Sequence, residues 1–457
     1  MAQTLRLLLV TPLLLTHFKA PEIAAWYLFG GLMFVGDAVN ARIGATFSRM
    51  IAFAAAGAED LSPVRDQSKV LHSEAAPNWQ LLRRAFGTIG FLNLMVTGAS
   101  ALVAVCLAAF GLPAILAEAA SPASILAAFG ILVASKCSTD VLQRYALTLR
   151  GLNHVALVNR WETAFSLVSV LVGALVLRAG ANIWQLALIM EGVMLVRSLL
   201  FRRICREAEA GVFGNARSYN WDKQIFGWAK EPLFKGMAIS FANVGAIQMA
   251  TLVYARHGAV EATAALLLSM RLLSAVQQIS SAPFYSHQPL LSRLLAQGRK
   301  DEVRHLCTRR IAAGQILFSI GVAMLALIGN WLLGLIGANA RLLDGFLLCC
   351  LGLGMALNLY LMQTLTVMAA GNDMVCYRRS VAAGLVSVAA SFVLIPAYGV
   401  AGFIASAFGA NLLFLNLAPA RIAAERLGMT PIGFMGSTIV PAACVVLACL
   451  LFFALKA

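Results

Sequence analysis

Long apolar stretches follow one another along the chain, and short polar segments separate them. Most of these stretches reach the roughly 20 residues that an α-helix needs to cross the hydrocarbon core of a bilayer. The pattern predicts thirteen spanning helices, of which the first is short. Their predicted ranges are 4–18, 21–50, 82–112, 123–149, 155–178, 182–203, 225–255, 260–288, 308–337, 341–370, 375–396, 399–423 and 432–455. The predicted fold class is therefore an all-α polytopic membrane protein.

The composition agrees with lipid as the main solvent of the fold. Hydrophobic residues make up 60% of the 457 residues and charged residues 12%, against roughly 45–50% and 25% in soluble globular proteins. So few charges cannot cover a soluble surface, which excludes an ordinary cytosolic enzyme and a disordered chain. The net charge of +15 would suggest nucleic acid in a soluble protein. In a membrane protein Lys and Arg mark cytoplasmic loops instead, so no nucleic-acid partner is expected.

Lys and Arg residues are divided unequally between the two sides of the predicted membrane. The three longest loops, 51–81, 204–224 and 289–307, fall on one side and are rich in both. The opposite side holds only Lys19, Arg178, Arg256, Arg341 and Lys456. Because basic loops stay in the cytoplasm, we expect a cytoplasmic N-terminus. Thirteen spans then place the C-terminus in the periplasm.

Two similar segments predict an internal repeat. Residues 47–52 (F-S-R-M-I-A) end the second predicted helix, and residues 291–296 (L-S-R-L-L-A) end the eighth. An even number of helices separates them, so the two halves would share one orientation, as in transporters built from parallel repeats. A chance recurrence of Ser-Arg at helix ends is the alternative. The predicted architecture is two six-helix bundles in a pseudo-twofold arrangement around a central cavity, plus one extra helix. Its parts are the first bundle over 1–210, a cytoplasmic linker over 211–224, the second bundle over 225–424 and the extra helix over 425–457.

Motifs of enzyme chemistry are absent from the sequence. The nine cysteines form no C-x-x-C and no paired Cys/His spacing, so no metal site is predicted. Neither H-E-x-x-H nor the phosphate-binding G-x-x-x-x-G-K-[ST] occurs, and G-x-S-x-G is missing as well. We therefore predict a protein that is not an enzyme and has no cofactor. Any transport would be driven by the substrate or by a gradient, with H⁺ and Na⁺ both open as the coupling ion.

Polar residues inside the apolar spans are the candidates for a functional site, because a charge at the bilayer centre costs at least about 2.5–3.5 kcal/mol. The span 260–288 has the clearest pattern. Its polar residues recur at intervals of three and four, which places them on one face of a helix. They are Arg271, Ser274, Gln278, Ser281 and Tyr285. A cation at mid-depth on a polar face favours the wall of a water-filled cavity, and a hydrogen-bonded seam between helices is the alternative.

Three further spans contribute candidates. Lys136 and Asp140 share one face of the span 123–149, where they can also neutralise each other as a structural pair at i, i+4. Asp37 and Arg42 lie in the span 21–50. Tyr360 and Gln363 form a polar patch in the span 341–370, which suits either helix packing or contact with a sugar.

Three short stretches resemble a known family. Residues 20–27 (A-P-E-I-A-A-W-Y) are similar to the start of its second helix, and residues 46–52 (T-F-S-R-M-I-A) to the end of that helix. Residues 396–402 (P-A-Y-G-V-A-G) resemble its turn between helices 11 and 12. The family is the Wzx-like group of polysaccharide flippases, in the multidrug/oligosaccharidyl-lipid/polysaccharide exporter (MOP) superfamily. The chain departs from the family pattern at Asn40 and Arg42, where the family often has Asp and Gly.

The resemblance implies a substrate, which is an oligosaccharide linked through pyrophosphate to a polyprenol. It implies export across the bacterial inner membrane by alternating access, for synthesis of O-antigen, capsule or exopolysaccharide. Arg42, Lys136 and Arg271 would then bind the pyrophosphate, since cations form charge-assisted hydrogen bonds with phosphate oxygens. The polar side chains named above would line the cavity and contact sugar hydroxyls. A polysaccharide polymerase and other export proteins are candidate partners, beside the lipid bilayer itself.

A multidrug/cation antiporter of the same fold is the first alternative function. Cationic substrates need acidic cavity walls and a protonatable carboxylate, which Asp37, Asp140 and Glu191 could supply. A polytopic glycan polymerase or ligase is the second alternative. Such enzymes usually have a large extracytoplasmic loop, and every predicted outside loop here is short.

Overall fold

The computed structural model describes residues 14–55, 77–152, 154–208, 220–285, 299–335, 340–370, 377–414 and 417–456, with His287, Leu291, Gly337 and Ala338. Every regular element in this part of the chain is a helix, so the predicted all-α class is confirmed. Each of the thirteen predicted ranges overlaps a helix of the structure, the first of them only at residues 14–17. Most of the predicted linker 211–224 lies outside the described residues, and so does the repeat segment 291–296 apart from Leu291. The division at the linker and the internal repeat stay predictions.

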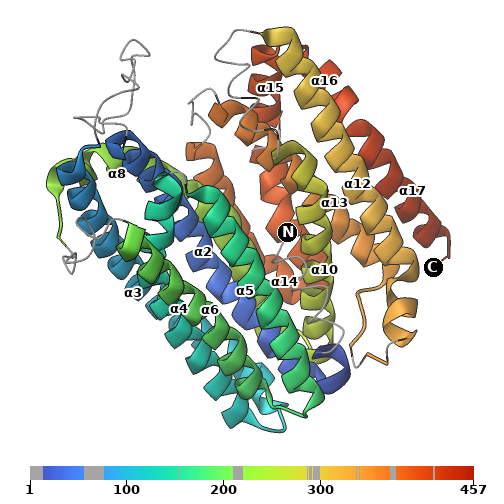
Figure 1. Cartoon of the computed structure of the whole chain (residues 1–457). Helices are drawn as coiled ribbons and strands as arrows, with labels where there is room; N and C mark the ends of the chain where they lie inside the picture. Colours follow the sequence, from blue (N-terminus) through green and yellow to red (C-terminus); the bar gives the residue numbers. More distant parts are fainter. Residues whose placement is uncertain are drawn as a thin grey trace.

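Five long helices gather on one side of the molecule, drawn from blue to green in Figure 1. They are α2 (Ala20–Ala55), α3 (Trp79–Ala117), α4 (Pro122–Gly151), α5 (Val155–Arg178) and α6 (Ile183–Ala208). Helix α4 is the centre of this first bundle, because it packs against α2, α3, α5 and α6. Aromatic pairs fill the interior, including Phe29 with Phe129, whose ring centroids are 5.1 Å apart.

The next span contains a π-helical turn and lies between the two halves of the molecule. It consists of α8 (Lys223–Ser240), the π-helical turn η1 (Phe241–Gly245) and α9 (Ala246–His257). Helix α9 packs against α2 and α3 on one side and against α14 (Tyr377–Phe414) on the other. Gly384 of α14 lies directly on η1, where a Cβ would come within 2.7 Å of the Ala242 Cα. This span therefore joins the first bundle to the second.

The remaining helices form a second bundle, drawn from yellow to red in Figure 1. They are α10 (Val260–Tyr285), α12 (Lys300–Leu335), α13 (Gly345–Ala370), α14, α15 (Leu417–Arg426), α16 (Pro431–Thr438) and α17 (Val440–Lys456). Helix α13 contacts α10, α12, α14, α15 and α17. Helix α10 also packs against α2, so it brings the second bundle directly onto the first.

The element α14 is a hairpin of two antiparallel limbs. The Ser387 hydroxyl donates a hydrogen bond to the carbonyl of Ser406, although a continuous helix would separate these residues by about 28 Å. The chain reverses at Gly399, whose φ of 55° and ψ of −125° lie outside the helical region and favour glycine. Gly402 then passes so close to the carbonyl oxygen of Leu394 that a Cβ would lie 2.0 Å from it. The predicted turn at residues 396–402 is confirmed, and α14 supplies two spans.

Most of the outer surface of the protein is expected to face lipid. Within the described residues, nine helices are long and apolar enough to cross a membrane, and the pair α16 and α17, bent by 55°, raises the number to ten. Large apolar side chains are exposed on the outer faces of these helices. Among them are Leu102, Leu171, Leu175, Trp331, Leu385 and Leu451. Exposed apolar side chains on helix after helix fit a multi-pass membrane protein.

Asp222 anchors the beginning of α8 to the first bundle. Its Oδ1 accepts hydrogen bonds from the backbone N–H groups of Gln224 at 2.9 Å and Ile225 at 3.2 Å, which caps the helix. Its Oδ2 accepts from the Arg84 guanidinium of α3 at 2.6 Å. The hydrogen bond from Arg84 holds the pKa of the Asp222 carboxyl below its ordinary value.

Replacing Asp222 should therefore have a modest, pH-dependent effect on stability. We expect Asp222→Ala to lower the free energy of unfolding by about 1 kcal/mol at pH 7, mainly through loss of the cap. Asp222→Asn keeps a good cap and should cost less. A carboxyl whose pKa is lowered by folding stabilises the protein above its unfolded pKa of about 3.9 and loses that effect as the pH falls below it. Thermal melts in detergent at pH 7 and at pH 3 would test this, and an equal loss for both variants at both pH values would contradict it.

Candidate functional site

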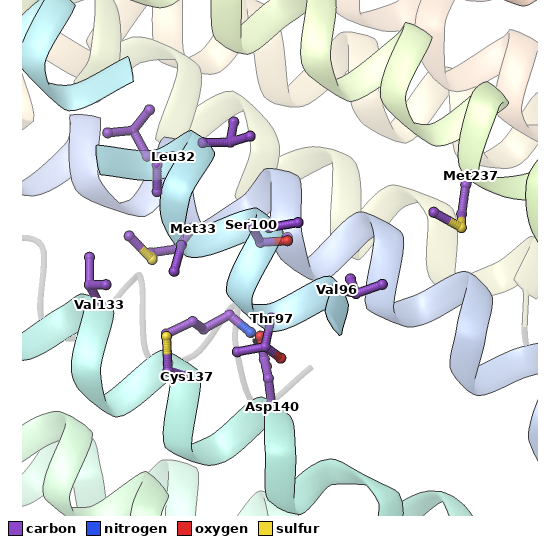
Figure 2. A pocket seen from close by; sticks show the side chains of 15 residues that line it. Leu32, Met33, Val96, Thr97, Ser100, Val133, Cys137, Asp140 and Met237 are labelled. Carbon is purple, nitrogen blue, oxygen red and sulfur yellow. Dashed lines mark hydrogen bonds and ion pairs between the residues drawn. The ribbon is translucent and has the colours of Figure 1, made fainter. Parts of the chain in front are cut away.

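A pocket of about 170 Å³ lies inside the first bundle, between α2, α3 and α4, with Met237 of α8 at its edge. Its lining is mostly apolar, as Figure 2 shows. The polar residues of the lining are Thr97 and Ser100 of α3 together with Lys136, Cys137 and Asp140 of α4. Mostly apolar walls with a few convergent polar groups are typical of binding sites for small molecules.

Lys136 bridges two carboxylates at this pocket. Its Nζ lies 2.7 Å from Oδ1 of Asp37 and also contacts Oδ1 of Asp140. Asn40 of α2 donates a hydrogen bond from Nδ2 to Oδ2 of Asp140 at 2.9 Å. We call Asp37, Asn40, Lys136 and Asp140 the acid–lysine cluster. It joins the polar faces of α2 and α4, and its two carboxylates and one ammonium give it a formal charge of −1.

The geometry of the cluster bears on the role predicted for Lys136. The side chain of Asp140 is 6% exposed and that of Lys136 is 21% exposed, whereas Asp37 is 47% exposed. The ammonium is therefore compensated by two acids, which favours the structural-pair interpretation of Lys136 over a cation free for pyrophosphate. The same arrangement could accept a proton or a small cation at the more exposed Asp37. Binding of any ligand by Asp37, Lys136 or Asp140 stays a prediction.

The spacing of Lys136 and Asp140 indicated that these two residues can pair. It did not indicate that Asp37 and Asn40 of α2 contact them. Asp37 and Asn40 are spaced at i, i+3, so they share a face, and that spacing was the available signal. The side chain of Arg42, two residues further on, lies outside the described part of the chain. Its predicted role as a cavity cation is therefore untested.

Arg271 of α10 lies at the contact between the two bundles. Its guanidinium rests against Gly30 of α2, where a Cβ would come within 2.9 Å of Nη2. Gln248 of α9 lies against Gly31 in the same way. A Cβ at Gly31 would lie 2.4 Å from Oε1 of Gln248. Two consecutive glycines on α2 thus make room for two polar side chains from α9 and α10.

The other helices of the second bundle do not cover the polar face of α10. Gln278 is exposed and Tyr285 is 37% exposed, whereas Leu273, Ala275 and Phe284 on other faces are buried. The hydroxyls of the stripe bond locally, Ser274 to the carbonyl of Met270 and Ser281 to that of Gln278. This placement agrees with a water-facing surface, and contact with a substrate stays a prediction.

Tyr360 and Gln363 do not line an open cavity in this structure. Both are buried in the second bundle, at 1% and 0% exposure. The Tyr360 hydroxyl accepts from Thr438 of α16 at 3.3 Å, and the Gln363 Oε1 accepts from Gln315 of α12 at 3.0 Å. The packing interpretation of this patch therefore holds here, because its face of α13 is turned toward neighbouring helices of the same bundle.

Arg144 is a residue whose placement the sequence did not indicate. It lies seven residues before the end of α4 at Gly151, and its side chain is 4% exposed. Its guanidinium lies 4.9 Å from the ring centroid of Phe86 and 5.1 Å from that of Tyr145. These rings offer cation–π contacts that help a cation to lie in an apolar interior.

Comparisons with known proteins point to one fold. No protein-family profile and no curated protein matches the chain. Among solved structures, it is similar to a multidrug resistance MATE family transporter of the MOP superfamily in an inward-facing conformation. The TM-score is 0.61 at 12% identity, over 93% of this chain and 94% of that one. The chain is therefore a multi-pass, all-α membrane protein with a MATE-like fold. The similarity supports the predicted fold class over almost the whole length of the chain.

Proposed function

We propose that this protein is a MOP-superfamily flippase that moves a polyprenyl-pyrophosphate-linked oligosaccharide across the bacterial inner membrane by alternating access. The product would serve synthesis of a surface polysaccharide such as O-antigen, capsule or exopolysaccharide. The observation that carries this proposal is the position of Arg271. It lies where the two bundles meet, and it begins the polar face of α10 that its own bundle leaves uncovered.

The chemistry of the substrate fits this position. A pyrophosphate must cross a medium of low dielectric constant, where an unpaired anion is strongly disfavoured. A guanidinium offers several donors in a planar fork and binds phosphate oxygens in a bidentate manner. The exposed Gln278 and Tyr285 further along α10 offer hydrogen bonds suited to sugar hydroxyls.

A multidrug/cation antiporter is the second candidate, and the acid–lysine cluster is the observation that favours it. The cluster has a formal charge of −1 and adjoins a mostly apolar pocket. A lipophilic cation would find both an apolar surface and an uncompensated carboxylate there. In a flippase, the same cluster would instead be the site of the coupling ion, either H⁺ or Na⁺.

Transport by the purified protein in liposomes separates the two candidates. One set of vesicles contains a fluorescent polyprenyl-pyrophosphate oligosaccharide, and its movement between leaflets is followed by protection from a membrane-impermeant quencher. A second set contains ethidium and a proton gradient. We expect protein-dependent movement of the lipid-linked sugar and none of ethidium. Movement of ethidium alone would overturn the flippase proposal in favour of the antiporter.

The topology is tested with reporter fusions. From the loop charges we expect the N-terminus in the cytoplasm and the C-terminus in the periplasm. Alkaline phosphatase fused after Ala457 should be active, and a fluorescent protein inserted within residues 60–70 should be fluorescent in the cytoplasm. An inactive phosphatase at Ala457, with a stable fusion, would mean that the number of spans is even.

A further inference from the structure

Four polar side chains are enclosed within the second bundle, away from the acid–lysine cluster. They come from three helices, and each has an exposure of 0%. We call them the buried polar node. Its members are Ser280 of α10, Gln315 and Ser319 of α12, and Gln363 of α13. The sequence predicted a cavity position for Gln363 and indicated no role for the other three residues.

The node is joined by one hydrogen bond. The Nε2 of Gln315 donates to the Oε1 of Gln363 at 3.0 Å. The reverse bond is not formed. The Oε1 of Gln315, the Nε2 of Gln363 and the hydroxyl oxygens of Ser280 and Ser319 have no hydrogen-bond partner within the described part of the chain.

The four groups lie close together because the helices approach closely. Gly314 of α12 faces α10 and α13, where a Cβ would lie 2.7 Å from the carbonyl oxygen of Ser280 and 3.1 Å from the Nε2 of Gln363. Gln315 follows Gly314 directly, and Ser319 is one helical turn away on the same face as Gln315. Gln315 and Gln363 thus meet beside Gly314, with the backbone of Ser280 on the facing side of α10 and Ser319 one turn further along α12.

Polar groups of this kind are destabilising when they stay unbonded in an apolar interior, and most buried polar groups in proteins have a partner. Lipid offers none, because the hydrocarbon core has no hydrogen-bonding groups. The groups differ in kind, which limits what can bind them. Gln363 Nε2 is a donor, Gln315 Oε1 is an acceptor, and each hydroxyl is both.

We propose that the buried polar node is a binding site for one internal water molecule between α10, α12 and α13. Water accepts from Gln363 Nε2, donates to Gln315 Oε1 and bonds to the serine hydroxyls. That gives it up to four hydrogen bonds, within the roughly two to four that buried waters make. A metal cation would need oxygen ligands alone and would be repelled by the amide N–H groups of Gln363. None of the four residues is a carboxylate, so nothing in the node would offset a cation's charge.

The water would connect α10, which also presents Arg271 and the polar face, to the body of its bundle. The proposal concerns this one binding site and does not depend on which substrate is transported. It would hold equally for a flippase and for an antiporter.

The direct test is a cryo-EM structure of the full chain, held by a rigid binding protein, at a resolution that resolves ordered waters. We expect one density peak within hydrogen-bond distance of both Gln315 Oε1 and Gln363 Nε2, in sodium chloride and in choline chloride alike. A peak that requires Na⁺ would overturn the proposal in favour of a cation. A direct bond from Gln363 Nε2 to Gln315 Oε1, with no peak, would overturn it as well.

Stability measurements provide an independent readout. Ser280→Ala removes one partner of the water and leaves the hydrogen bond between Gln315 and Gln363 in place, so we expect the melting temperature in detergent to fall. Ser138→Ala, at an exposed position of α4, is the control and should change the melting temperature by about a degree or less. An unchanged or higher melting temperature for Ser280→Ala would indicate a dry node with an unbonded hydroxyl, which would overturn the proposal.

Discussion

Arg271→Ala should reduce movement of the lipid-linked oligosaccharide by about 10- to 100-fold and leave the protein folded and inserted. A hydrogen bond to a charged group contributes about 1.5–3 kcal/mol, and every 1.4 kcal/mol is a factor of ten. Arg271→Lys should restore only part of the rate, since an ammonium keeps the charge and loses the planar fork. Transport in liposomes measures the rate, and gel filtration in detergent reports on folding.

Two further variants make the result specific to this position. Arg178→Ala removes an exposed arginine at the end of α5 and should transport at the wild-type rate. Gly30→Leu keeps Arg271 but fills the space in which its guanidinium rests, so we expect a loss similar to that of Arg271→Ala. If Arg271→Ala transports normally, the anion-site interpretation is wrong. If it fails to accumulate, Arg271 has a structural role.

The helices could be predicted from the sequence because lipid imposes a simple rule on each of them. A span must be apolar over about 20 residues, and this signal is local. The predicted range 155–178 is the same as that of α5, and 123–149 differs from α4 by one residue at the start and two at the end. The turn at residues 396–402 could also be predicted, since the backbone at Gly399 adopts a positive φ that favours glycine.

The contacts between helices could not be predicted in the same way. Periodicity shows which residues share a face, but it does not show which faces meet. Lys136 and Asp140 lie on one helix, so the alternative that they pair could be derived from their i, i+4 spacing, whereas Asp37 comes from a helix about a hundred residues earlier. The same limit explains Tyr360 and Gln363, whose polar face is turned toward α12 and α16. The π-helical turn Phe241–Gly245 has no proline to indicate it.

Lys136→Met should strongly destabilise the protein. It would remove the only ammonium of the acid–lysine cluster and leave Asp140, which is 6% exposed, with a charge that Asn40 alone stabilises. Breaking a buried ion pair by removing one partner typically costs about 3–5 kcal/mol. That is a large part of the roughly 5–15 kcal/mol that holds a folded protein together. We therefore expect a much lower yield of monodisperse protein and a large fall in melting temperature.

A second substitution should reverse most of this loss. In Lys136→Met/Asp140→Asn the buried charge is gone, and the new amide can still accept the hydrogen bond that Asn40 donates to Asp140 at 2.9 Å. Lys235→Met is the matched control, because Lys235 pairs with Glu231 at the same i, i+4 spacing on α8, with side chains 36% and 59% exposed. An exposed pair contributes only about 0–1 kcal/mol, so this variant should melt close to the wild type. Equal melting temperatures for Lys136→Met and Lys235→Met would show that the cluster does not need its lysine, and the ion-pair interpretation of Lys136 would then be wrong.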